Sequence, residues 1–211
     1  IQGIHEPKQD EEITISEATI GKVVHRVMQE LYAPYIKKVV TADVIQDILD
    51  SLTDDYWEEL PTSAVHSDYL ALYITKSYVR NILLYDQTQA PFIYYNGEQK
   101  VEGKINVPLV GIVPFYGYID RLDKKDNTLR VIDYKTGKAE VEYLDMKHIF
   151  HRSENQDKAL QTMLYCWLLE QKSPELLANS LYIAPHIYPV RSILKLNENQ
   201  TLVHQKGYNN F

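Results

Sequence analysis

The spacing of apolar residues in the N-terminal part of the chain is that of helices. Apolar side chains recur every three or four positions from Ile20 to Tyr35, which is typical of an amphipathic helix. Thr41-Ala42-Asp43 and Ser67-Asp68 each precede a further run and are typical helix caps. The pattern therefore predicts a helix beginning near Ser16, a second from about Thr41 to Glu59, and a third from Ser67-Asp68 to a point before Pro91.

The pattern then changes to short aromatic and β-branched runs, which are typical of strands. The first lies within residues 92–113 and contains Asn96-Gly97, a strong hairpin signal. Two further strands are predicted at about 115–123 and 128–135, with the polar residues 124–127 between them.

A helix over about 155–170 follows, and then short strands at 180–183, 187–193 and 201–203. This order of elements is typical of an α+β or mixed α/β fold. We expect one domain over residues 1–211, with a mainly helical flank over 1–90 and a sheet core over 91–205.

Composition excludes several classes of protein. The chain has 211 residues, and no apolar run approaches the ~20 residues that cross a bilayer. Its one cysteine, Cys166, excludes an internal disulfide, a four-thiolate zinc site and a four-cysteine iron–sulfur cluster. The net charge of −7 argues against a free-standing, non-specific nucleic-acid binder, unless the acidic residues cluster at a metal site. Since the chain starts at Ile1 without a signal-peptide pattern, we expect a segment of a longer cytoplasmic protein.

Two carboxylates and a lysine form the most informative cluster. Asp133 and Lys135 are alternate residues of a predicted strand and therefore point to the same side, whereas Ile132 and Tyr134 point into a core. A turn centred on Asp126-Asn127 places Asp120 directly opposite Asp133, with Cβ atoms about 4.5–5.5 Å apart. An odd-length loop would break this register.

Two facing carboxylates in apolar strands repel each other and need compensation. One solution is a shared proton, and the other is a divalent cation. Lys135 on the same side suits the cation, because it can stabilise developing negative charge or orient an attacking water. A purely structural Asp–Lys cluster is the alternative, and the three residues in register favour the functional interpretation.

These motifs resemble those of the PD-(D/E)XK nuclease superfamily. Gly117-x-Ile119-Asp120-Arg121 is followed by Ile132-Asp133-Tyr134-Lys135-Thr136-Gly137, as in RecB/AddB-type nuclease domains and related CRISPR-associated exonucleases. A Gly-x-x-x-His motif is matched by Gly21 and His25, and a Gln-x-x-x-Tyr motif by Gln161 and Tyr165. The four motifs occur in the order found in the family.

The resemblance implies a restriction-endonuclease-like core, a mixed central sheet flanked by helices, and a role for each matched residue. His25, Asp120 and Asp133 would bind Mg²⁺ or Mn²⁺, with the Tyr134 carbonyl completing the shell. Lys135 would be the catalytic lysine. Gln161 and Tyr165 would line the active-site channel and position the DNA strand or Lys135. Taken alone, His25 is more typical of a structural residue at the edge of the core, and Gln161 and Tyr165 of a hydrogen-bonded pair.

Other residues are expected to contribute less directly. Glu102 is a further candidate for an acidic position in the family. Arg121 faces the other side of its strand and is expected to form a salt bridge or have a structural role, not a catalytic one. His148 and His151 could form a second metal site, although a solvated loop is the simpler interpretation. A basic strip would contact DNA phosphates through Lys135, Lys138, Lys147, Arg152 and Lys158.

The sequence thus predicts a metal-dependent DNA nuclease. The resemblance further implies an exonuclease module in recombination or repair, with a helicase-like domain or subunit as partner and no iron–sulfur cluster. Two alternatives stay open: a catalytically silent nuclease-fold module that binds DNA or the partner subunit, and hydrolysis of RNA or another phosphodiester.

Overall fold

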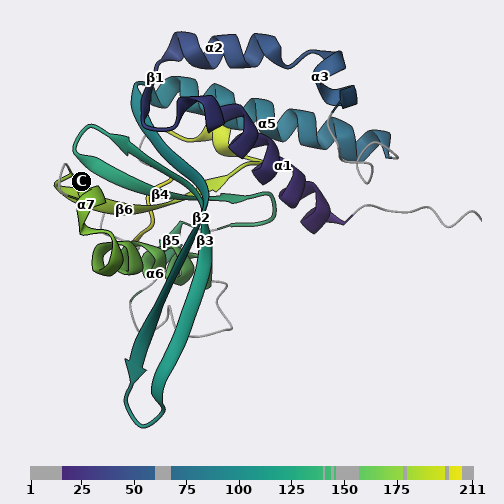
Figure 1. The fold of residues 1–211 in the computed structure, drawn as a ribbon. Helices are drawn as coiled ribbons and strands as arrows, with labels where there is room; N and C mark the ends of the chain where they lie inside the picture. Colours follow the sequence, from purple (N-terminus) through teal and green to yellow (C-terminus); the bar gives the residue numbers. More distant parts are fainter. Residues whose placement is uncertain are drawn as a thin grey trace, which may run out of the picture.

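A five-stranded sheet forms the centre of the computed structural model (Figure 1). The structure describes residues 16–59, 68–139, 141–143, 145, 157–177, 180–197 and 200–205. The strands lie in the order β1 (Lys38–Val40), β2 (Phe92–Val107), β3 (Gly111–Lys125), β4 (Thr128–Lys135) and β6 (Tyr182–Pro189). All neighbours are antiparallel except β4 and β6, which are parallel. The predicted mixed sheet flanked by helices is therefore confirmed.

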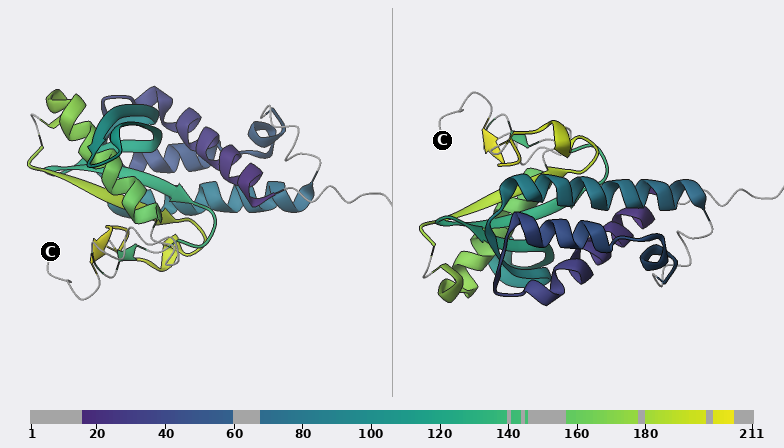
Figure 2. Two further views of the ribbon diagram at one scale, coloured as in Figure 1. Left: turned by 90° about the horizontal axis from the view of Figure 1, so that it is seen from below. Right: turned by 90° about the horizontal axis from the view of Figure 1, so that it is seen from above.

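Helices cover both sides of this sheet (Figure 2). One side carries α1 (Glu17–Tyr32), α2 (Ala42–Ser51), α3 (Asp54–Glu59) and α5 (Tyr69–Gln89). The other carries α6 (Asp157–Lys172), which belongs to the crossover that a parallel strand pair requires, and the short α7 (Pro174–Leu177). No helix in the described part of the chain is long and apolar enough to cross a membrane.

The helix starts follow the predicted caps. The side chains of Ser16, Thr41 and Asp68 accept hydrogen bonds from backbone amides of the first turns of α1, α2 and α5. The predicted second helix is divided at Leu52 and Thr53, because Thr53 accepts a hydrogen bond from the Tyr56 amide and so begins α3. One helical turn, η1 (Ala33–Tyr35), follows α1.

Alternation along β4 divides the core into two layers. Ile132 and Tyr134 pack in the cluster formed with α1, α2 and α5, as predicted. Leu129 and Val131 pack in the cluster beneath α6. Asp133 therefore lies on the α6 side of the strand, at the end nearest to α1.

The predicted turn at Asn96-Gly97 is wrong, because β2 continues through these residues. A bulge lies between Tyr94 and Asn96, and the Tyr94 hydroxyl occupies the space beside Gly97, where a Cβ atom would lie 2.5 Å from it. The glycine thus serves close packing rather than a turn. The actual hairpin turn is at residues 108–110, where Leu109 has a positive φ of 68°. Gly111, the first residue of β3 after the turn, also has a positive φ, of 97°.

The outer halves of β2 and β3 form a two-stranded arm that packs against α6 and extends away from α1, α2 and α5 (Figure 1). Their pairing runs to Val107 and Gly111. β4 pairs with β3 only from Arg121 onward, so the described part of β3 before Arg121 is paired with β2 alone. We call residues 100–118 the arm.

The C-terminal strands differ from the prediction. Residues 182–189 form the single strand β6 where two were expected, and the 3₁₀ turn η4 (Ile193–Lys195) follows. Leu202, in the predicted strand 201–203, forms only a bridge to His186. A second sheet pairs β5 (Glu142–Tyr143) with β7 (His204–Gln205).

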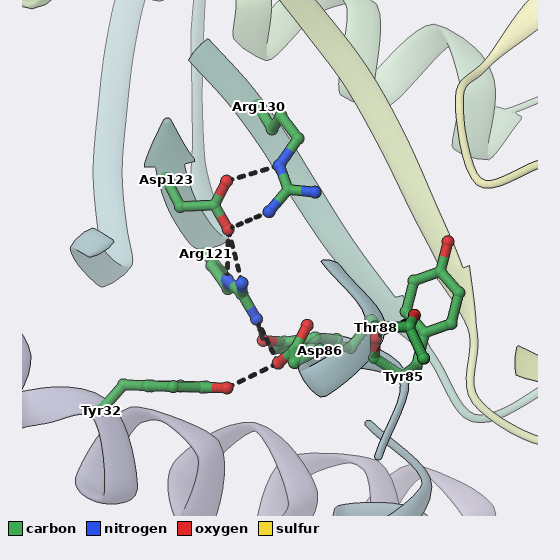
Figure 3. Close-up of polar contacts among 8 residues, drawn as sticks. Tyr32, Tyr85, Asp86, Thr88, Arg121, Asp123 and Arg130 are labelled. Carbon is green, nitrogen blue, oxygen red and sulfur yellow. Dashed lines mark hydrogen bonds and ion pairs between the residues drawn. The ribbon is translucent and has the colours of Figure 1, made fainter. Parts of the chain in front are cut away.

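A buried network of charges connects the sheet to α1 and α5 (Figure 3). Arg121 is 1% exposed and donates to Asp86 of α5 at 2.5 Å and to Asp123 at 2.7 Å. Arg130 completes the network on Asp123, and Tyr32 donates to Asp86 at 2.7 Å. The structural salt bridge expected of Arg121 is thus confirmed.

Candidate active site

The two predicted carboxylates lie where β3 and β4 separate. The ladder between these strands runs from Lys125–Thr128 to Arg121–Ile132, so the turn is centred on Asp126-Asn127 as predicted. The next pair in this register is Asp120 and Asp133. In place of a further ladder bond, the Tyr134 amide donates to Oδ2 of Asp120 at 2.7 Å.

Asp120 is held in an environment that disfavours its charge. Burial and the neighbouring charge of Asp133 raise its pKa to about 7, and the charge of His25 opposes this only in part. The repulsion expected between facing carboxylates is therefore present at this end of the sheet.

Asp133 and Lys135 form an ion pair on the same side of β4. Lys135 Nζ lies 2.8 Å from Oδ1 and 2.6 Å from Oδ2 of Asp133. Burial raises the pKa of Asp133 despite the lysine beside it. The ion pair places the Lys135 ammonium group next to the carboxylates. The Lys135 side chain stays partly exposed, whereas that of Asp133 is buried.

His25 reaches the carboxylates from α1. Gly21, one turn earlier, lets the helix approach the end of β4, because a Cβ atom there would lie 3.1 Å from the Thr136 hydroxyl. His25 Nε2 lies 3.1 Å from the Tyr134 carbonyl oxygen, which can only accept, so Nε2 carries a hydrogen. Nδ1 is then directed at Asp120 Oδ1 and Glu98 Oε1, each at 3.4 Å.

Glu98 is the functional candidate that the sequence did not reveal. It follows the β2 bulge with a φ of +50°, which places its carboxylate beside His25 and Asp120. Glu102, the acidic candidate from the sequence, lies on the arm instead and pairs with Lys100 at 2.6 Å. The register of β2 and β3 beyond the bulge places Glu98 opposite Asp120, whereas the register before the bulge would place it opposite Ile119.

The donor set of His25, Glu98 and Asp120 fits a divalent cation. Their ligand atoms lie within 4.8 Å of one another. Neighbouring donors around an octahedral Mg²⁺ with bonds of about 2.1 Å are about 3 Å apart, close to the 3.4 Å separations here. A cation would also compensate the two carboxylates that otherwise raise the pKa of His25 against the effect of its burial.

Gln161 and Tyr165 lie on α6, on the other side of the carboxylates. Gln161 Nε2 donates to the Tyr165 hydroxyl at 2.7 Å, as expected of a hydrogen-bonded pair. Burial raises the pKa of Tyr165, and the charges of Asp133 and Asp120 add to this effect. The ring lies against Gly117, where a Cβ atom would be 2.4 Å from the hydroxyl oxygen. The Gly117 of the sequence motif therefore makes room for this tyrosine.

Comparison with known proteins agrees with this geometry. A model of the PD-(D/E)XK nuclease superfamily matches residues 1–206. The chain belongs to this superfamily. Asp120 and Asp133-Tyr134-Lys135 fit the acidic and (D/E)-x-K positions that its name describes. No curated protein matches the chain significantly.

The predicted basic strip of this nuclease-superfamily chain can be located only in part. Lys138 is exposed shortly after β4, and Lys158 pairs with Asp157 at 2.7 Å at the start of α6. Lys147, Arg152 and the two histidines 148 and 151 lie outside the described residues. Cys166 is buried, and burial raises the pKa of its thiol to about 12, so it remains a protonated core residue.

Proposed function

We propose that the chain is a metal-dependent deoxyribonuclease that removes nucleotides from DNA ends. The observation that carries this proposal is the convergence of His25, Glu98 and Asp120 next to the Asp133–Lys135 pair. The superfamily match supports nuclease activity. The motif order from Gly21 to Tyr165 supports an exonuclease of the RecB type.

Each residue has a definite role in this proposal. His25, Glu98 and Asp120 would hold the cation, with Asp133 beside them as the further ligand that the family resemblance implies. The Tyr134 carbonyl orients His25 through its Nε2–H. A Mg²⁺ or Mn²⁺ ion held by these residues would supply a nucleophilic water at neutral pH and would neutralise the phosphate. Lys135 stabilises charge that develops on the phosphate, and Tyr165, held by Gln161, positions the strand. The imidazole among the ligands favours Mn²⁺ over Mg²⁺.

The cellular role is part of the same proposal. We place the enzyme in DNA recombination or repair in the cytoplasm, acting with a helicase-like domain or subunit that delivers DNA ends. The support is the resemblance of the four motifs to those of RecB/AddB-type domains.

The test is cleavage of end-labelled single- and double-stranded DNA and RNA in Mg²⁺, Mn²⁺ or EDTA. Asp133→Ala and Lys135→Ala are compared with Asp47→Ala and Lys195→Ala, which change exposed residues away from the site. We expect metal-dependent release of short products from DNA ends, lost in the first pair of variants and kept in the second. DNA binding without cleavage in any metal would favour the catalytically silent module, and internal cuts would contradict the exonuclease.

A further inference from the structure

A groove lies between the arm and the C-terminal half of α6. Its volume is about 820 Å³, and its walls come from both strands of the arm and from the last two turns of the helix. Leu168 closes its floor by packing onto Gly103, where a Cβ atom would lie 2.4 Å from the leucine Cδ2. The groove is therefore built by the fold and is separate from the cluster of His25, Glu98 and Asp120.

The groove combines exposed aromatic rings with lysines. Tyr116 is 69% exposed, Tyr118 50% and Trp167 38%, although large aromatic side chains usually lie mostly buried. Tyr118 is paired across the arm with Lys100, which is itself bound to Glu102. In the described part of the chain, no ion pair engages the other two lysines of the groove, Lys104 and Lys172.

This local charge differs from that of the whole chain. The net charge is −7, yet the charged residues of the groove are Lys100, Lys104 and Lys172 against Glu102 alone. A locally positive groove on an otherwise acidic protein attracts an anion to the groove rather than to the rest of the surface. The alternation of rings and lysines is the composition of a surface for single-stranded nucleic acid, in which bases stack on rings and phosphates meet cations.

The groove begins beside the candidate active site. Tyr118 is two residues from Asp120 on β3, a distance of about 7 Å along a strand. Lys100 is likewise two residues from Glu98 on β2. A strand whose phosphate lies at the carboxylates can thus continue directly into the groove.

We propose that this groove binds a single DNA strand on its way to the metal site, with Tyr116, Tyr118 and Trp167 stacking on bases and with Lys104 and Lys172 on phosphates. This inference rests on the proposed function and adds the form of the substrate. A duplex is not the occupant, because its bases already stack on each other and leave no face for the rings.

The first test measures binding in EDTA, where no metal-dependent cleavage occurs. Fluorescence anisotropy with a labelled oligothymidine compares the wild-type chain with Tyr116→Ala/Tyr118→Ala. Tyr69→Ala/Tyr73→Ala is the matched control, since these tyrosines are exposed on α5. Loss of one stacking contact weakens binding about fivefold or more, so we expect about 25-fold for the pair and no change in the control.

The second test measures the salt dependence of the same binding. Each phosphate contact on a single strand contributes about −0.7 to the slope of log K against log salt, so Lys104→Ala/Lys172→Ala should flatten the slope by about 1.4. Lys195→Ala, an exposed lysine outside the groove, should leave it unchanged. Circular dichroism of every variant excludes misfolding as the cause.

The outcomes separate this inference from the proposed function. If the wild-type chain binds the oligonucleotide through the groove but cleaves nothing in any metal, the groove stands and the nuclease proposal fails. If the wild-type chain cleaves DNA while the Tyr116→Ala/Tyr118→Ala variant binds the oligothymidine with unchanged affinity, the groove assignment is overturned. An equal loss of affinity for a blunt duplex would overturn the single-strand assignment.

Discussion

The Tyr134 backbone amide donates to the Asp120 carboxylate at 2.7 Å, in place of the next ladder bond between β3 and β4. The two strands therefore separate at Asp120 and Asp133, the two candidate carboxylates. On its other side the Tyr134 carbonyl holds His25. The backbone of one residue, Tyr134, thus contacts candidate metal ligands from both the sheet and α1.

This contact separates the structural role of Asp120 from its charge. In Asp120→Asn the amide oxygen can still accept from Tyr134, so we expect the melting temperature of the metal-free protein to be unchanged or higher, because repulsion with Asp133 is removed. Cleavage should fall by at least about 100-fold, since the metal site loses a charge. Asp120→Ala should in addition lose about 1–3 kcal/mol of unfolding free energy, as the amide is left without a partner. Equal cleavage by Asp120→Asn and wild type would contradict the assignment of Asp120.

Binding of Mn²⁺ should distinguish Glu98 from Glu102. A ligand at 100 times its Kd stabilises the folded state by about 2.7 kcal/mol, which raises the melting temperature by about 5–10 °C for a chain of this size. Glu98→Gln should lose most of this shift and Glu102→Gln should keep it, since only Glu98 lies with His25 and Asp120. EDTA should reverse the shift. Scanning fluorimetry gives the result, and loss of the shift in Glu102→Gln instead would restore the assignment made from sequence.

Gly117→Ala should displace Tyr165. The added methyl group would meet the tyrosine hydroxyl and ring at 2.4–2.7 Å, at a cost of about 1–3 kcal/mol. Gly137→Ala, which meets nothing within 4 Å, is the control. We expect Gly117→Ala and Tyr165→Phe both to slow cleavage, measured at a temperature where each variant is folded. Wild-type rates in both would mean that Tyr165 has no part in positioning the strand.

The buried charges around Arg121 should dominate the stability of the sheet. Arg121→Met leaves Asp86 without its cation and should lower the unfolding free energy by about 3–5 kcal/mol. Arg26→Met removes an exposed pair with Glu30 on α1 and should cost less than about 1 kcal/mol. Urea unfolding measures both changes. Adding Asp86→Asn to Arg121→Met should recover part of the loss, and a purely additive result would contradict a direct interaction.

His186 should make the fold sensitive to moderate acid. Burial and the charge of Arg130 lower its pKa from 6.5 to about 3, while Nδ1 lies 2.9 Å from the Thr201 hydroxyl. The unfolded chain therefore binds a proton at His186 that the folded chain excludes. The contribution of His186 to the unfolding free energy is fully present above pH 6.5 and is lost as the pH drops toward 3. Between pH 6.5 and 5 the wild type should lose about 2 kcal/mol more than His186→Gln. Parallel urea-unfolding profiles of the two proteins would contradict this.

The sequence predicted those parts of the site that depend on local chemistry. Asp126-Asn127 between two apolar strands defines the turn and with it the register of β3 and β4. Because side chains alternate along a strand, this register places Asp120, Asp133 and Lys135 at one end of the sheet. Ser16 and Asp68 likewise identify the helix starts. In these places, neighbouring residues alone determine the backbone.

The remaining parts depend on packing between distant segments. Asn96-Gly97 has the chemistry of a turn, but pairing along the full length of β2 outweighs it, and Tyr94 fills the space over the glycine. Glu98 reaches the site only because of that bulge. The contact between Arg121 and Asp86 joins residues that are 35 positions apart, and no periodicity indicates such a pair.

The arm has a further consequence for how such a domain can vary. From Asn96–Leu122 at its base, through the arm, to Val107–Gly111, the pairing of β2 and β3 keeps one register without a shift. Inserting or deleting one residue on each strand near the tip would leave every pair closer to Asp120 in place. The length of the arm can therefore change during evolution without any adjustment at Asp120, so that the candidate site and the reach of the arm can vary independently.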